Sequence, residues 1–157
     1  MEFTFNKWLL KKKQLDKLSQ ENYWEKLQHP NKHHPIRPYR GELFVVELGI
    51  NVGFEFSSLH LSLIIQNDIG NTFRNTTIII PITDYKDGKF DKYVNKKITN
   101  EDLESKVLNG LNKDPSKLKL EDIRIIDKAR LEAKIGKVKP EYIKEVENKL
   151  KKLLSFD

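Results

Sequence analysis

Histidine is the residue type in this sequence best suited to acid–base chemistry, and there are four. His60 lies alone in an apolar stretch, and because imidazole titrates near neutral pH it could serve as a general acid or base. His29, His33 and His34 lie among prolines, where adjacent histidines without a supporting carboxylate form a weak metal-ligand pattern. We therefore interpret 29–38 as a solvated linker and expect no metal site. The absence of cysteine excludes thiolate ligands, cysteine nucleophiles and disulfides.

The charge of the chain is concentrated at its two ends. The 29 basic and 23 acidic residues give a net charge of +6, which hints at nucleic acid without establishing it. Residues 1–40 carry nine basic and four acidic side chains, 41–116 carry eight and eleven, and 117–157 carry twelve and eight. A uniformly basic surface is therefore not expected. No apolar run approaches the roughly 20 residues of a membrane helix, so we expect a soluble, cytoplasmic protein without a signal peptide or membrane contact.

A long helix is the first element that the pattern predicts. Apolar residues from Phe5 to Leu27 recur at helical spacings, which indicates an amphipathic helix over 3–28. Its two tryptophans should be docked, either on the protein's own domain or on a partner protein or second copy. Three prolines then predict an extended linker. The expected organisation is an N-terminal helix, 1–28, a Pro/His-rich linker, 29–39, and a main domain, 40–157.

Short strands dominate the main domain. β-Branched and aromatic runs predict strands over 43–48, 59–66 and 76–82, with turns at 49–51 and 67–71. Strands at this spacing suggest a barrel or a strongly curved sheet. The expected elements that follow are a loop over 84–92, a short strand over 93–98, a helix from Thr99 or Asn100 to Leu108, a strand over 117–126, a short helix over 127–134, and a last helix from Pro140.

Several short motifs occur in a fixed order along the main domain. Residues 40–48 (RGELFVVEL) and 51–55 (NVGFE) form a strand and a G-x-E loop. The runs 63–71 (LIIQNDIGN) and 78–83 (IIIPIT) follow, and then 120–131 (LEDIRIIDKARL). Together these motifs resemble the MazF/PemK toxins, whose pattern near the end is L-E-Q-I-R-T-I-D-K-x-R-L. The similarity spans about 40–83 and 117–154, with none found for 1–39 and a strong departure over 84–116.

The resemblance implies a fold that is mainly β with helices: an SH3-like, CcdB/PemK-type β-barrel with a C-terminal helix, here with an added N-terminal helix. It also implies a homodimeric toxin of a type II toxin–antitoxin system. Such a toxin is a sequence-selective, metal-independent endoribonuclease (an mRNA interferase) that cleaves single-stranded RNA through 2′-hydroxyl attack, uses no cofactor, and is held inactive by a cognate antitoxin protein. The alternative on the same fold is a non-catalytic toxin or binding module, which poisons a protein target or binds RNA or an antitoxin.

The family's active site pairs an arginine after the G-x-E loop with a threonine at the end of the next long strand. Thr83 matches that threonine, and its hydroxyl is expected to donate to a phosphate oxygen. The arginine is absent here: His60 stands in its place, and the proline that follows it in the family is missing. Either His60 acts as the acid or base, or the site has lost its phosphate-binding group and catalysis with it.

The resemblance adds further candidates around this pair. Lys119 and Glu121 lie where a relative, the Kid toxin, carries a catalytic arginine and aspartate. Lys119 could supply the missing positive charge, or the two could be the solvated face of a strand. Glu55 could orient His60 or cap its loop, and aromatic rings in an RNA groove can stack on bases, although one of them could instead pack in the core. The expected RNA contacts are Arg40, Phe54, Glu55, Phe56, Ser57, Ser58 and Glu121.

Overall fold

Strand β3 (Thr76–Asp84) lies at the centre of a curled antiparallel sheet in the computed structural model, which describes residues 2–86 and 88–156. The middle of β3 pairs with β2 (Leu59–Ile64). Its first half pairs with β7 (Arg124–Asp127) and its last residues with β6 (Ser116–Lys119). One long β-branched strand therefore holds three neighbours together.

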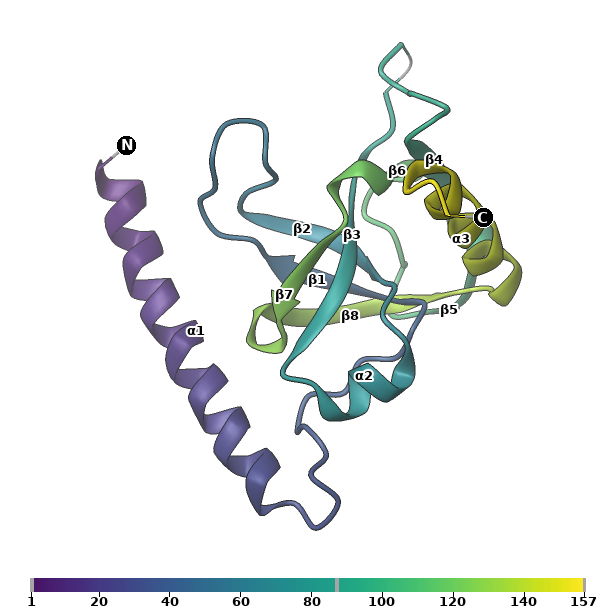
Figure 1. The fold of residues 1–157 in the computed structure, drawn as a ribbon. Coiled ribbons are helices and arrows are strands. Elements are labelled where there is room, and N and C mark those ends of the chain that lie inside the picture. The colour runs from purple at the N-terminus through teal and green to yellow at the C-terminus, as the bar shows by residue number, and fades with distance from the viewer. Residues whose placement is uncertain (1, 87, 157) are drawn as a thin grey trace.

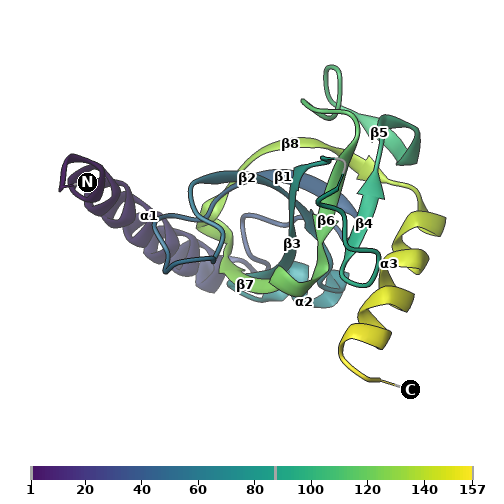
Figure 2. The ribbon, with the colours of Figure 1, turned by 90° about the horizontal axis from the view of Figure 1, so that it is seen from above.

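The remaining strands extend the sheet on both sides of β3. Beyond β2 come β1 (Glu42–Glu47), β8 (Leu131–Val138) and β5 (Leu103–Lys106), and beyond β6 comes β4 (Asn95–Ile98). The order is β4-β6-β3-β2-β1-β8-β5, and every pairing is antiparallel. The sheet curls on itself, as the view from above shows (Figure 2). The expected mainly β fold with helices is confirmed as this curled, eight-stranded sheet.

Two apolar clusters form because side chains alternate between the faces of each strand. Leu63 and Ile80, which are directly opposite, belong to the larger cluster beneath the C-terminal helix α3 (Pro140–Leu153). Ile64 and Ile79, the next opposed pair, belong to the second cluster, which also contains part of the loop between β1 and β2. The sheet thus has a packed core on each face.

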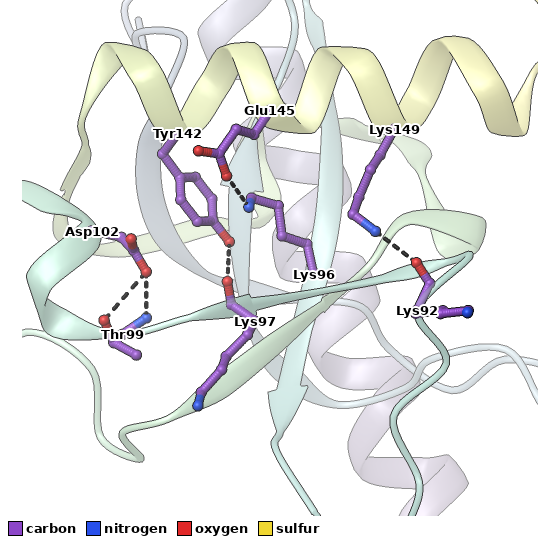
Figure 3. Close-up of polar contacts among 8 residues, drawn as sticks. All are labelled: Lys92, Lys96, Lys97, Thr99, Asp102, Tyr142, Glu145 and Lys149. Atoms are coloured by element: carbon purple, nitrogen blue, oxygen red, sulfur yellow. Dashed lines mark hydrogen bonds and ion pairs between the residues drawn. The ribbon is translucent and has the colours of Figure 1, made fainter.

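Helix α3 is fastened to strand β4 by polar contacts as well as by the core. Figure 3 shows Tyr142 reaching from α3 to β4, where its hydroxyl donates to the Lys97 carbonyl at 2.9 Å. Lys96 forms an ion pair with Glu145 of the helix, and Lys149 donates to the Lys92 carbonyl at 2.7 Å. Because Lys96 points toward α3, the neighbouring Lys97 side chain points to the other face of the strand (Figure 3).

Replacing Tyr142 with phenylalanine should lower the free energy of unfolding by about 1 kcal/mol. The buried Tyr142 hydroxyl bonds the Lys97 carbonyl, and the variant keeps the ring while leaving that carbonyl without its donor. Chemical denaturation measures the change. Tyr93→Phe is the matched control because Tyr93 is largely exposed, and an equal loss in both variants would contradict the structural role of the bond.

The N-terminal helix α1 (Glu2–Gln28) lies on the opposite side of the sheet from α3 (Figures 1 and 2). The Trp8 ring packs on Gly49, where an added Cβ would lie 2.4 Å from it. Gly49 also has a positive φ of 79°, so both the contact and the backbone favour glycine. Trp24, by contrast, is exposed. The expected helix is confirmed, but its expected amphipathic character is wrong, because its apolar side chains do not gather on one face. One of its two tryptophans is docked on the domain.

Several expected elements differ from the structure. The helix expected up to Leu108 is a single 3₁₀ turn, 100–102, followed by β5. Most of the turn expected at 67–71 belongs to a short helix, α2 (Asp68–Phe73), which Asn67 caps. The strand over 117–126 is broken by a 3₁₀ turn, 120–122. The helix over 127–134 is also one turn, 128–130, because residues from 131 onward pair with β1. The loop expected over 84–92 includes residue 87, which lies outside the described residues.

Candidate active site

His60 and Thr83 meet at the ends of two neighbouring strands. Ser62 of β2 is directly opposite Pro81 of β3. Extending this antiparallel register by two residues brings His60 opposite Thr83 on the same face of the sheet. Both residues also line one cavity of about 490 Å³, a volume within the range of small-molecule sites. The expected pair, 23 positions apart in the sequence, is therefore brought together.

The loop between β1 and β2 holds His60 through Phe56. The two rings meet edge to face, with centroids 4.7 Å apart and planes at 87°. Phe56 packs against the second apolar cluster, so it is a core contact as well as a neighbour of His60. Phe54 is fully exposed and is therefore the aromatic ring free to stack on a base.

Internal hydrogen bonds shape the same loop. The Asn51 side-chain amide donates to the carbonyls of Leu48 and Phe56, at 2.9 and 2.6 Å. Its backbone N–H donates to the Ser57 hydroxyl at 3.0 Å. Glu55 accepts a bond from the Val52 N–H at 3.2 Å and so caps the loop.

Ser58 has the backbone conformation of a turn residue. Its φ is +65°, its side chain is exposed, and its N–H donates to the Gly49 carbonyl at 2.7 Å. This bond and the return bond from the Leu48 N–H to the Ser58 carbonyl close the base of the loop. Among the described contacts, Glu55 and Ser57 shape the loop, and Ser58 closes it.

Lys119 and Glu121 form an ion pair beside this loop, with 2.8 Å between the ammonium nitrogen and a carboxylate oxygen. The hydrogen bond to Glu121 raises the pKa of Lys119 above its usual value. Glu121 also lines a groove of about 300 Å³ that contains Glu55, Phe56, Asp122 and Arg124. The carboxylates of Glu55, Glu121 and Asp122 make this groove mostly acidic. The ammonium of Lys119, beside the groove, stays protonated.

Arg40 lies apart from the other candidates. Its guanidinium forms an ion pair with Glu147 of α3 and donates to the Ile65 carbonyl, and its backbone N–H donates to Asp68 at 2.7 Å. These contacts tie the start of β1 to α3 and α2. The structure does not bring Arg40 together with His60 and Thr83.

A group of lysines at the end of β3 was not among the expected site residues. Lys86, Lys89 and Lys117 line a pocket of about 200 Å³ with Thr83 and Asp84. Lys117 is directly opposite Thr83 on the adjacent strand β6. The alternation in Lys117-Leu118-Lys119 already places both lysines on one strand face, and this signal could have identified Lys117.

The linker histidines make structural contacts. His29 and His33 stack with centroids 4.7 Å apart. His34 is buried, which corrects the expected solvated linker at that point, and its Nδ1 accepts the Ile36 N–H at 3.0 Å. Burial is the main cause that lowers the pKa of His34. Within 2–86 and 88–156, no three or more His, Asp or Glu side chains gather so that they could hold a metal ion.

None of the described helices is both long and apolar enough to span a bilayer.

Comparison with known proteins relates the sequence of this chain to a family of toxins. Residues 39–154 match the family described as "PemK-like, MazF-like toxin of type II toxin-antitoxin system". The chain is 36% identical over 111 residues to endoribonuclease EndoA of Bacillus subtilis (strain 168), covering 71% of this chain and 89% of that protein.

Solved structures share the fold. MazF (Form-I) from Deinococcus radiodurans superposes with a TM-score of 0.55 and 18% identity, covering 76% of this chain and 97% of that chain. An endoribonuclease in complex with its cognate antitoxin, from Mycobacterial species, gives a TM-score of 0.51 and 15% identity over 76% of this chain and 95% of that chain.

Proposed function

This chain belongs to the family of PemK-like, MazF-like toxins of type II toxin–antitoxin systems, and we propose that it is an endoribonuclease that cleaves single-stranded RNA without a metal ion. The observation that carries this activity is the meeting of His60 and Thr83 at one cavity. Cleavage by a neighbouring 2′-hydroxyl needs a group that accepts a proton near neutral pH and donors for the developing charge. The relative from Bacillus subtilis, which is an endoribonuclease, supports endoribonuclease activity for this chain.

In the proposed reaction the neutral imidazole of His60 takes the proton of a ribose 2′-hydroxyl. The 2′-oxygen attacks the adjacent phosphorus, and the bond from phosphorus to the 5′-oxygen of the next nucleotide breaks. That oxygen takes a proton from water, so the products are a 2′,3′-cyclic phosphate and a 5′-hydroxyl. The Thr83 hydroxyl donates to a non-bridging oxygen as its negative charge grows, and the exposed Phe54 ring stacks on a base.

We further propose that a cognate antitoxin protein holds this toxin inactive, and that the toxin acts as a homodimer in the cytoplasm. A solved structure of similar fold, in which an endoribonuclease is bound to its cognate antitoxin, supports the antitoxin as a partner. In this proposal residues 40–157 form the catalytic domain, while the helix over 1–28 and the linker over 29–39 are an addition that lies almost wholly outside the family match at 39–154.

Cleavage should be equally fast with and without a chelator. We expect the purified protein to cut a long single-stranded RNA in excess EDTA and to leave 5′-hydroxyl ends, which a polynucleotide kinase labels without prior phosphatase treatment. Activity that disappears in EDTA and returns with Mg²⁺ would contradict the metal-independent reaction. A protein that arrests cell growth but cuts no RNA would instead support the non-catalytic toxin.

A further inference from the structure

A row of three residues crosses the sheet next to the candidate active site. Thr83 of β3 is directly opposite Lys117 of β6, and Lys117 is directly opposite Lys97 of β4. Directly opposed residues share a face of the sheet and lie about 5 Å apart. Lys97 points away from α3 (Figure 3), so the row lies on the face that α3 does not cover. One threonine and two lysines are therefore neighbours across three strands, and the Lys97 ammonium lies over the Tyr85 ring, 5.1 Å from its centroid.

Lys117 and Lys119 lie on the same face of β6 but differ in their partners. The positive charge of Lys119 is balanced by the Glu121 carboxylate, which lies 2.8 Å from the ammonium nitrogen. The Lys117 ammonium donates to the Lys89 carbonyl at 2.5 Å, and among residues 2–86 and 88–156 no ion pair includes it. Asp84, the carboxylate in the same pocket, is paired with Lys113 at 2.6 Å.

Lys117 is also an unusual lysine because its residue surface is only 6% exposed. Burying a cation without an anionic partner is costly. Burial lowers the pKa of Lys117, and the nearby Lys119 lowers it further, while the charge of Glu121 opposes this effect. An anion in the pocket would stabilise the charged form. With Lys86 and Lys89 also lining the pocket, the complementary ligand is a group of negative charge such as a phosphodiester.

We propose that Lys117, rather than Lys119, binds the scissile phosphodiester beside Thr83 and supplies the positive charge that the family's arginine would provide. This inference rests on the proposed RNA cleavage. The ammonium and the Thr83 hydroxyl bind non-bridging oxygens from the same side, while His60 serves the 2′-hydroxyl. Lys97, Lys86 and Lys89 continue the basic surface along the path of the RNA backbone.

Kinetics of three variants test the proposal. The cut site is first mapped on long RNA, and a short oligonucleotide that contains it is then the substrate. Lys117→Met should lower kcat/KM by about 10- to 100-fold, whereas Lys117→Arg, which keeps the charge, should restore most of the activity. Lys119→Met is the matched control on the same strand face and should change kcat/KM little. Thermal unfolding checks that each variant is folded, and Lys117→Gln replaces Lys117→Met if the latter is not.

RNA binding separates failure of this inference from failure of the proposed function. The probe is the same oligonucleotide with a 2′-deoxy residue at the cut site, or random-sequence single-stranded RNA if the wild type cuts none. Lys117→Met should reduce the slope of log K against log salt by about 0.7, the value of one lost phosphate contact. If the wild type binds RNA without cutting it, the proposed nuclease activity is wrong, but the change in salt dependence still tests whether Lys117 contacts a phosphate. An unchanged slope, an equal loss in Lys119→Met, no rescue by arginine, or no RNA binding by the wild type would overturn the role of Lys117.

Discussion

Replacement of His60 by alanine should lower the rate of RNA cleavage by about 100- to 10,000-fold, the usual contribution of a general acid or base. His60 is the histidine that lines the cavity with Thr83, and its ring is held by the edge-to-face contact with Phe56. The described residues that line this cavity include no second imidazole. Single-turnover cleavage of a mapped oligonucleotide measures the loss.

His60→Arg distinguishes proton transfer from charge. Arginine stays protonated at every accessible pH and accepts protons poorly, so this variant should remain slow even though it restores the family's residue type. His33→Ala, at a linker position away from the cavity, is the control. An arginine variant as active as the wild type would show that position 60 supplies charge and not a base.

The strands that carry the site follow from local sequence, and their exact limits do not. The run 76–82 predicts β3 within two residues, because its short length and its enrichment in β-branched residues favour a buried strand over a helix. Asp127 caps a turn as expected, accepting the Ala129 N–H at 2.8 Å. This 3₁₀ helix is only one turn long because the residues that follow it pair with β1 and form β8. Tertiary pairing therefore overrides the capping signal.

The candidate site shows a similar division. Motif order identifies His60 and Thr83, and the antiparallel β2–β3 pair brings them together. The alternation around Lys117 gives its strand face, but the sequence does not specify that this strand pairs with β3 and brings Lys117 opposite Thr83. The segment 41–116 is net acidic, yet the sheet gathers Lys86, Lys89 and Lys97 beside Lys117. Topology, rather than net charge, creates the basic surface.

Lys128 is a buried charge at a distance from this site. It has no exposed surface, and its ammonium donates to the Asn71 carbonyl of α2 at 2.5 Å. Burial lowers the pKa of Lys128 from 10.5 to about 8, and Lys26 and Arg37 add to this effect while Asp127 opposes it. The folded state therefore releases the Lys128 proton at a lower pH than the unfolded chain does.

The free energy of unfolding should consequently increase with pH relative to a Lys128→Met variant. Between pH 8 and 10.5 the unfolded chain binds more protons at this position than the folded chain, so raising the pH favours folding. The difference in unfolding free energy between wild type and Lys128→Met should change by about 2 kcal/mol in favour of the wild type from pH 7 to pH 9.5. Urea denaturation at several pH values measures it, with Lys144→Met, at an exposed position of α3, as the control. A difference that stays constant across this range would mean that Lys128 remains protonated in the fold, and its bond to Asn71 would then stabilise the charge more strongly than burial opposes it.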